Sequence, residues 1–217
     1  MDGIGRLWEY PSLTSIETFD VVEKVTSKRC QFGQVQSVDI LNDYLLIVRE
    51  KAILIYDFES PDEPVGSITL DSPSTSRTPL LPASYRCGRF FNESVLIAAG
   101  DLVAMYSVPH LRLVSRTVVR TKAVTALAAS GHLIAYGCSD GSVGVLSSSL
   151  ATVLHLKEVH AFSVSSVCFA PNLLLSASVD GTLSIIPSSN YSRRYGGYLV
   201  ILLAILIIYL AYLWNLH

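Results

Sequence analysis

The residues that most often carry out chemistry are scattered along this 217-residue chain. The four cysteines, Cys30, Cys87, Cys138 and Cys168, lie far apart and form no CxxC pair, and the five histidines are equally dispersed. Zinc sites and disulfide frameworks depend on regularly spaced ligands, which are absent here. We therefore predict reduced thiols in a cytosolic fold, without a metal site and without a bound cofactor.

Motifs for nucleotide or hydrolytic chemistry are also missing from the sequence. It contains no GxxxxGK[ST], no HExxH and no Gly-x-Ser-x-Gly, and Gly3-Ile4-Gly5 lacks the third glycine of a dinucleotide fingerprint. The net charge is −2 and Lys and Arg do not cluster, which argues against a nucleic-acid surface. We expect no catalytic residue, no small-molecule substrate and no nucleic-acid partner, so the chain is not predicted to be an enzyme.

An unbroken apolar run from Tyr198 to Trp214 nearly ends the sequence. At about 1.5 Å per residue it would span roughly 25 Å, close to the thickness of a hydrocarbon core. A buried core helix is the alternative, but such a helix would normally carry a polar stripe. The run therefore predicts one transmembrane helix over 198–214, with 215–217 as a lumenal tail.

Charges beside the predicted span indicate its orientation. Arg193 and Arg194 precede it, within a predicted juxtamembrane linker over 191–197, and no Lys or Arg follows it. Because positive charge stays on the cytoplasmic side, the bulk of the chain should be cytosolic. The short span favours a thin bilayer such as that of the endoplasmic reticulum, in which the chain would be a single-pass protein.

Short apolar strands separated by turn residues fill the rest of the chain. Asp140-Gly141 and Asp180-Gly181 each stand between two apolar runs, which is a strong hairpin signal. Weaker turns fall at Gly100-Asp101 and Glu50-Lys51. Counted from Asp2-Gly3, the turns are spaced by about 47, 50, 40 and 40 residues, and four-stranded units of about 40–45 residues are typical of β-propeller blades.

Each unit should contain an inner strand, a hairpin and an outer strand. We predict strands within these ranges: 4–11, 35–41, 43–58, 65–70, 84–91, 94–109, 112–118, 123–130, 132–147, 163–171 and 172–187. The Ser/Pro-rich stretch 71–82 is predicted to be a surface loop. The predicted fold is therefore all-β over residues 1–190, with about four blades and half of another, followed by the membrane helix.

Two stretches resemble WD repeats. DGIGRLW at 2–8 is similar to the DGxxRxW strand that ends a WD blade, and His160 followed by SVSSVCFAP and LLLSASVDGTLSI is similar to a complete repeat. The resemblance implies a hydrogen-bonded network of His160, Ser178 and Asp180, with Ile186 in place of the usual Trp. His160 would then hold a blade together rather than act as a ligand or a base. Asp140 and Asp180 would be turn residues rather than catalytic acids.

Four blades are fewer than the seven usual in the WD family. A propeller has to close, because otherwise its first and last blades expose edges and apolar faces. We therefore expect N-terminal blades to lie upstream of Met1. A compact propeller of few blades, or closure by self-association, is the alternative.

A WD propeller followed directly by a C-terminal anchor resembles the endoplasmic-reticulum exchange factors that load GTP onto Sar-type small GTPases. DGIGRLWEYPSLTSI, the RTKAVT stretch before YGCSDGSVGVL, and HLKEVHAFSVSSVCFAP carry the resemblance along nearly the whole chain. It implies a guanine-nucleotide exchange factor that starts assembly of coat protein complex II and therefore ER-to-Golgi transport. In that family a loop of an N-terminal blade, shaped by a potassium ion, enters the nucleotide site.

No segment of this chain matches that exchange loop, so no exchange residue is carried over. The alternative function is a membrane-tethered WD scaffold that binds proteins without exchange activity. A tail-anchored fusion-machinery protein would need a heptad helix before the anchor, and the sequence has none.

Overall fold

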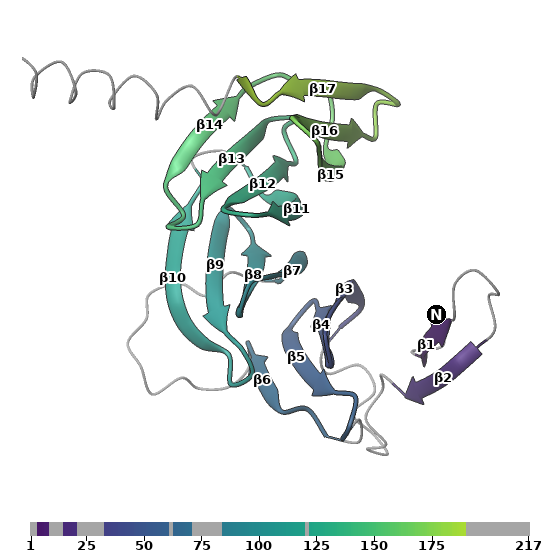
Figure 1. Cartoon of the computed structure of the whole chain (residues 1–217). Coiled ribbons are helices and arrows are strands. Elements are labelled where there is room, and N and C mark those ends of the chain that lie inside the picture. The colour runs from purple at the N-terminus through teal and green to yellow at the C-terminus, as the bar shows by residue number, and fades with distance from the viewer. Residues whose placement is uncertain are drawn as a thin grey trace, which may run out of the picture. The chain divides into compact units, whose positions relative to one another are not determined.

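The computed structural model describes residues 4–8, 15–20, 33–60, 63–70, 84–119 and 122–189. Every named element in these ranges is a strand, and all the sheets are antiparallel (Figure 1). The all-β prediction is therefore confirmed. The chain divides into two compact units, residues 1–127 and residues 128–217.

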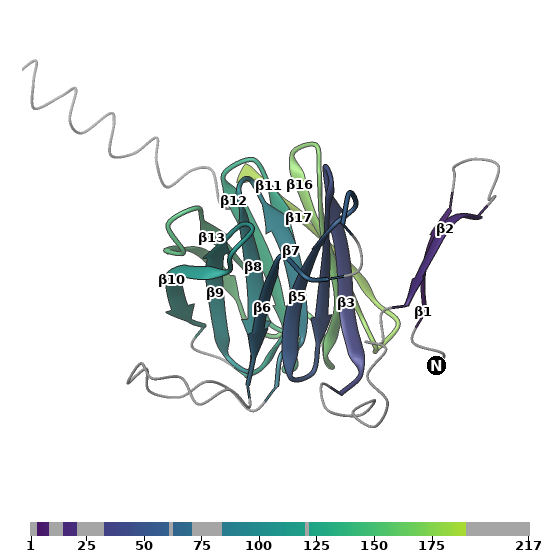
Figure 2. The same cartoon turned by 90° about the horizontal axis from the view of Figure 1, so that it is seen from below.

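The first unit holds a hairpin and two four-stranded sheets, each with its strands in chain order. The hairpin pairs β1 (Ile4–Trp8) with β2 (Ser15–Asp20). One sheet comprises β3 (Val35–Leu41), β4 (Tyr44–Arg49), β5 (Ala52–Asp57) and β6 (Gly66–Thr69). The other comprises β7 (Cys87–Phe91), β8 (Ser94–Ala99), β9 (Leu102–Ser107) and β10 (Arg112–Val118). In Figure 2, β3, β5, β8 and β9 lie roughly along the same axis, with β8 and β9 antiparallel.

The remaining strands form one sheet of four and one of three. β11 (Val124–Ser130), at the junction of the two residue ranges, heads the sheet that continues with β12 (Leu133–Cys138), β13 (Val143–Ser147) and β14 (Thr152–Leu156). β15 (Val164–Ala170), β16 (Leu173–Ser178) and β17 (Leu183–Pro187) form the three-stranded sheet. Within the second unit, β15 packs against β12.

The middle strands of the sheets are apolar on both sides. Five of the six residues are buried in β4 (YLLIVR), β8 (SVLIAA) and β12 (LIAYGC). A strand reads as a continuous apolar run only when both of its faces are covered, whereas a half-exposed strand alternates. Burying one such large side chain stabilises the fold by about 1.5–3 kcal/mol. Each of these sheets therefore needs packing on two faces.

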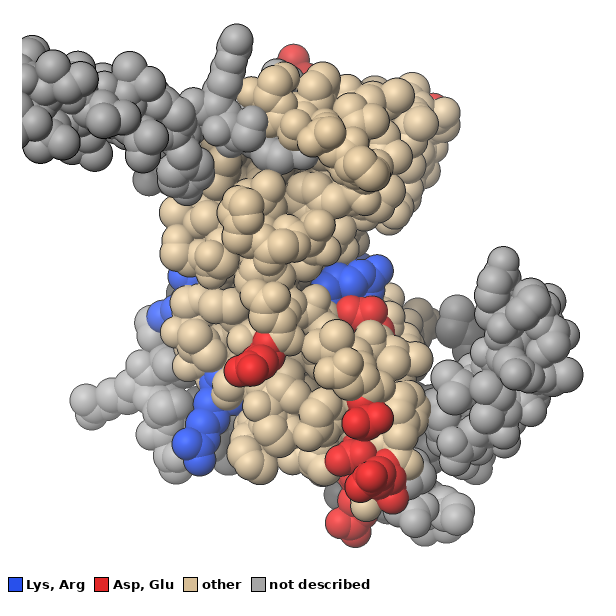
Figure 3. All heavy atoms as spheres, viewed as in Figure 1, with Lys and Arg blue, Asp and Glu red and all other residues tan. Residues whose placement is uncertain are grey.

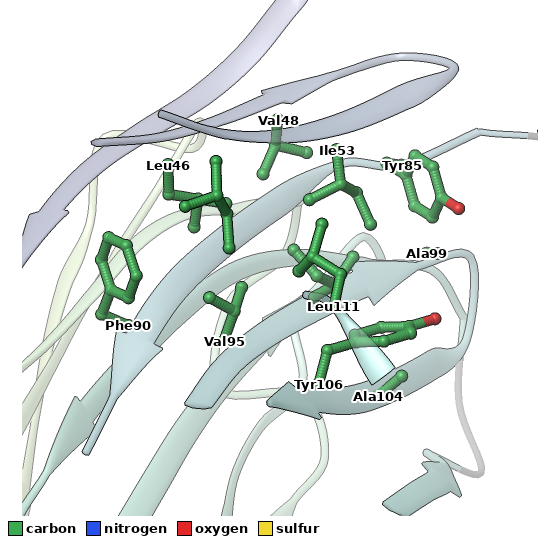
Figure 4. Packing of buried hydrophobic residues seen from close by; sticks show 12 residues of the cluster. Leu46, Val48, Ile53, Tyr85, Phe90, Val95, Ala99, Ala104, Tyr106 and Leu111 are labelled. Carbon is green, nitrogen blue, oxygen red and sulfur yellow. The ribbon is translucent and has the colours of Figure 1, made fainter. Parts of the chain in front are cut away.

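Packing in the first unit is visible between the β3–β6 sheet and the β7–β10 sheet, where β7 contacts β3 and β4 (Figure 4). The buried cluster comprises Leu46, Val48, Ile53, Ile55, Tyr85, Phe90, Val95, Ile97, Ala99, Ala104, Tyr106 and Leu111. Polar contacts accompany it: Ser37 Oγ donates to the carbonyl of Gly88 (3.1 Å), and Phe90 N donates to Asp39 Oδ2 (2.8 Å). The two sheets are thus joined by apolar contacts and by side chains that bind the facing backbone.

Strand and turn positions agree with the sequence prediction. The strands 35–41 and 112–118 have the predicted bounds, and the strand predicted over 65–70 covers 66–69. Glu50-Lys51 and Gly100-Asp101 are two-residue turns between paired strands. The pattern gave no separate assignment to β2 or to β14.

Three sequence predictions fall outside the described residues. They are the loop over 71–82, the linker over 191–197 and the span over 198–214 with its tail 215–217. In the part of the chain that the structure describes, no helix has the length and hydropathy needed to cross a membrane.

Candidate functional site

Two turns of the second unit, at Asp140 and at Asp180, have the same backbone design. Cys138 and Ser142 are joined by a bond from N to O (2.9 Å), as are Ser178 and Thr182 (3.2 Å). The third loop residue is a glycine with positive φ, +81° at Gly141 and +78° at Gly181, while neither aspartate has a positive φ. Each loop is therefore a type I turn followed by a left-handed residue, one residue longer than the shortest Asp-Gly hairpin.

Gly141 is also required because another segment lies close to it. A Cβ atom at this position would lie 1.9 Å from the carbonyl oxygen of His160. The backbone amide of His160 donates to the carbonyl of Gly141 (3.2 Å). The turn thereby supports the segment between β14 and β15, which carries His160.

Both aspartates are held by their own loops. Asp140 Oδ1 accepts from the amide (3.1 Å) and the hydroxyl (2.5 Å) of Ser142, and Asp180 Oδ1 accepts likewise from Thr182 (2.8 and 2.6 Å). Asp180 differs because its Oδ2 also accepts from the amide of Ala161 (2.9 Å). The hydrogen bonds, first of all that of the Thr182 hydroxyl, lower the pKa of Asp180 to about 2. Asp180 is therefore a carboxylate that ties two loops together.

His160 lies at the centre of this arrangement and is buried (5% exposed). Its Nδ1 is 2.7 Å from Thr182 Oγ1, and its Nε2 is 2.8 Å from Ser176 Oγ. Because the Thr182 hydroxyl hydrogen is donated to Asp180, Nδ1 must donate to Thr182. In the neutral ring Nε2 then accepts from Ser176. The chain of bonds runs from Ser176 through His160 and Thr182 to Asp180, and we call these four residues the His160 network.

One member of the predicted network was wrong. The resemblance to a WD repeat implied Ser178 as the network partner of His160, but the hydroxyl on the ring belongs to Ser176. Ser178 Oγ instead lies 3.1 Å from the carbonyl of Phe162 and 3.0 Å from that of Ser163. Ser176 and Ser178 are two residues apart on β16 and share a face, so alternation could not distinguish them. The ring therefore bonds a residue two positions earlier along β16 than the resemblance implied.

The order of groups in the His160 network resembles a Ser-His-Asp triad, but the network cannot act as one. A nucleophilic serine must reach a substrate, and its histidine must be oriented directly by the acid. Ser176 is only 1% exposed. Asp180 Oδ1 is 3.8 Å from His160 Nδ1, with Thr182 interposed. The network therefore has a structural role, as the sequence predicted for His160.

In the β11–β14 sheet, the position that corresponds to Ser176 is occupied by one member of an aromatic pair. Tyr136, at the position equivalent to Ser176, is 1% exposed, and its hydroxyl lies 3.0 Å from His155 Nδ1. The two rings are stacked, with centroids 6.3 Å apart. Burial raises the pKa of Tyr136, so the phenol keeps its proton. Gly144 provides the space, since a Cβ there would lie 2.3 Å from the tyrosine ring.

The His160 network fixes a surface rather than a cavity. It holds the 160–163 segment against the Asp180 turn, where Val179 N donates to the carbonyl of Ser163 (3.1 Å). The apolar side chains that project from these two loops are Phe162 (64% exposed) and Val179 (73% exposed). We call this pair the turn surface. Contiguous exposed apolar area is typical of protein-binding sites.

Charge is scarce around the turn surface. Residues 128–189 contain only four charged side chains, Asp140, Lys157, Glu158 and Asp180. The part of Figure 3 that carries β14 to β17 is accordingly almost entirely tan, whereas acidic side chains gather lower in the view. A surface with so few Lys and Arg residues is unsuited to phosphate backbones.

Metal-binding groups are not brought together in the part of the chain described. No set of three or more His, Cys, Asp or Glu side chains there could hold an ion. Cys87 and Cys138 are buried in different sheets, and Cys168 is exposed on β15.

No protein-family model matches the chain, and no curated protein matches it. Among solved structures, 1108 chains match. One is the computationally designed Ika4 protein, with a TM-score of 0.57 and 17% identity over 71% of this chain and 91% of that chain. A second is the computationally designed Ika8 protein, with a TM-score of 0.58 and 18% identity over 70% of this chain and 45% of that chain.

A third match is a chain of the mitotic checkpoint complex, with a TM-score of 0.63 and 15% identity over 85% of this chain and 54% of that chain. The chain thus spans about half the length of the second and third matches. At identities of 15–18% the likeness shows the fold alone. A fold found in so many solved chains does not select a function.

The corrected partner of His160 can be tested by a double-mutant cycle. Ser176→Ala should cost about 1–3 kcal/mol in the free energy of unfolding, because it leaves His160 Nε2 buried without a partner. Combined with His160→Ala, it should show a coupling of at least about 0.5 kcal/mol. Urea denaturation of the four proteins measures both. The control is a second cycle that combines Ser178→Ala with His160→Ala. A larger coupling in the control cycle than in the Ser176 cycle would contradict the assignment of Ser176.

Asp180 should make stability depend on pH in the acid range. Its pKa is lowered from 3.8 to about 2, so its contribution is complete above the higher value and is lost as pH falls toward the lower one. Asp180→Asn has a single side-chain oxygen and cannot accept both from Thr182 and from the Ala161 amide, so it should melt at a lower temperature near neutral pH. The gap in melting temperature between the two proteins should close between about pH 4 and pH 2. A gap that stayed constant over that range would show that the Asp180 charge does not bind the loop.

Proposed function

We propose that this chain is a WD-repeat protein of the β-propeller type that acts by docking another protein. The support is the repetition of four-stranded antiparallel sheets at the predicted spacing, together with the His160 network in the last sheet. A histidine, a strand hydroxyl and a turn aspartate in one hydrogen-bonded chain are the arrangement that the WD resemblance implies. The match to a chain of the mitotic checkpoint complex is compatible with such a fold.

The observation that carries a docking function is the turn surface. The network is used to hold two loops whose outward side chains, Phe162 and Val179, are 64% and 73% exposed. The two side chains project from loops that are hydrogen-bonded to each other, and a partner that covers them would bury apolar area. The same residues leave no accessible nucleophile, so binding rather than covalent chemistry is proposed.

We propose further that the docked protein is a Sar-type small GTPase and that the chain is part of its membrane-anchored exchange factor. This rests on the resemblance of the sequence to the endoplasmic-reticulum exchange factors, whose animal member is called prolactin regulatory element-binding protein. The order of WD stretches, the stretch before Asp140 and the apolar run 198–214 supports it. The anchor would confine encounters to the membrane on which coat protein complex II assembles.

A membrane-tethered scaffold without exchange activity is the second candidate. It is favoured by the fact that no segment here matches the family's exchange loop, which has to act at the phosphates and magnesium of the GTPase. Both candidates require the turn surface, but only the first requires nucleotide release. A measurement of nucleotide release on the GTPase therefore separates them.

For the exchange function we expect the chain extended upstream, with all its blades, to accelerate release of fluorescent GDP from a Sar-type GTPase. Residues 1–217 alone should bind that GTPase weakly and release little nucleotide. Phe162→Asp should weaken binding by about tenfold or more, since a charge then replaces a desolvated aromatic side chain. Val114→Asp, on exposed β10, is the matched control. No acceleration by the extended chain would leave the scaffold as the function.

The proposed topology has its own test in the turn between β7 and β8. Asn92 belongs to an Asn-Glu-Ser sequon and is exposed in that turn, so a glycosyltransferase in the lumen could reach it. In microsomes the body should be digested by added protease, and Asn92 should carry no glycan. A glycan on Asn92 would reverse the orientation and exclude a cytosolic GTPase as partner.

A further inference from the structure

The three-stranded sheet exposes residues that are buried in every other large sheet. Leu183 and Ile185 of β17 pair with Ala177 and Leu175 of β16. They are 64% and 59% exposed. In each four-stranded sheet, the equivalent residues of the third strand are those that pair with the fifth and the third residue of the second strand. They are Ile53 and Ile55, Val103 and Met105, and Val143 and Val145. Five of these six are 0% exposed, and Met105 is half-buried.

The first unit shows what covers such a face. There Ile53 and Ile55, with Leu46 and Val48 beside them, lie against Phe90, Val95 and Ile97 of the next sheet (Figure 4). The covering element is thus the first half of a following sheet. The bare counterpart on β15–β17 comprises Cys168, Leu175, Ala177, Leu183 and Ile185, and we call it the β17 face.

Strand β3 is the equivalent of the covering strand β7, and on β3 the corresponding residues are exposed. Phe90 is the second-to-last residue of β7, and the second-to-last residue of β3 is Ile40. Two residues earlier, Gly88 of β7 corresponds to Val38 of β3. Phe90 is 8% exposed, but Ile40 is 46% and Val38 is 51% exposed. In β15, the equivalent of Val38 is Val167, which is 6% exposed. We call Val38 and Ile40 the β3 face.

Among the described residues, both halves of the contact made internally between the β3–β6 and β7–β10 sheets are therefore also present uncovered. Neither half includes a charged side chain, so neither resists being removed from water. The two halves lie in different sheets of the chain. The β3 face of one copy can therefore pack on the β17 face of a second copy. Such a contact joins unlike surfaces of identical molecules and is therefore heterologous.

We propose that two copies of this chain associate head to tail, with the β3 face of one copy packed on the β17 face of the other. The contact repeats the sheet-to-sheet packing of the first unit, with Ile40 in the role of Phe90 and with Leu183 and Ile185 in the roles of Ile53 and Ile55. This association concerns residues 1–217; blades upstream of Met1, which the proposed exchange factor requires, would compete for the same two faces.

The test uses full-length protein in detergent micelles, with micelles in large excess, and sedimentation velocity as the measurement. The native chain should associate as its concentration rises. Ile40→Lys and Ile185→Glu each place a charge in one half of the contact and should raise the dissociation constant at least about 30-fold. Val114→Glu changes an equally exposed residue of β10 (56% exposed) outside both halves and should leave association unchanged.

Mixing the two variants distinguishes this contact from other forms of association. Each variant keeps one intact half, so an equimolar mixture of Ile40→Lys and Ile185→Glu should form dimers and nothing larger. Recovery by mixing also shows that both variants are folded. Monomers in the mixture, undiminished association of either variant alone, or a native chain that stays monomeric would each overturn the proposal.

A covalent readout identifies the residues in contact. A chain with Ile40→Cys and Cys168→Ser should form a disulfide with a native chain through Cys168 under mild oxidation. Peptide mass spectrometry would detect the 40–168 link between copies. Links only between 168 and 168 would indicate an isologous contact instead and would contradict the head-to-tail arrangement.

Discussion

Burial of the second strands β4, β8 and β12 on both faces is the constraint on which this structure depends. An antiparallel sheet with one face in water would alternate buried and exposed residues, but β4, β8 and β12 each have five consecutive buried residues. A single sheet cannot cover both of its own faces, so every sheet requires a neighbour on each side. The cluster between the first two large sheets shows how that requirement is met inside the chain. Leu183 and Ile185 show a place where the described residues do not meet it.

His160 is buried in this apolar stack with both of its ring nitrogens hydrogen-bonded. His160 has a partner on each ring nitrogen, and its neighbour Thr182 passes the bond on to Asp180. A buried imidazole with one unpaired nitrogen would destabilise the sheet that it joins. The two-loop geometry around His160 is thus a consequence of burial, and the exposed positions of Phe162 and Val179 follow from that geometry. The hydrogen bonds that satisfy the buried His160 ring thus also position the loops that carry the proposed docking surface.

Much of the fold could be predicted from the sequence, because strand periodicity and turn chemistry are local properties. Strand 112–118, the turns at Glu50-Lys51 and Gly100-Asp101, and both Asp-Gly hairpins follow from a few neighbouring residues. The partner of His160 was missed because Ser176 and Ser178 lie on the same face and differ only in depth. The Tyr136–His155 pair gave no signal, since its contact depends on the space left by Gly144 across the strand pair. Periodicity tells which face a residue occupies but not which atom it meets.

The low charge of residues 128–189 affects how fast partners can meet this part of the chain. Long-range attraction between oppositely charged surfaces can raise association rates by orders of magnitude above about 10⁵–10⁶ M⁻¹s⁻¹. With only four charged side chains in that whole range, three acidic and one basic, there is little field to orient an approaching molecule. Encounters would be governed by diffusion and would change little with ionic strength. Recognition would then be decided after collision, by how long the apolar contacts persist.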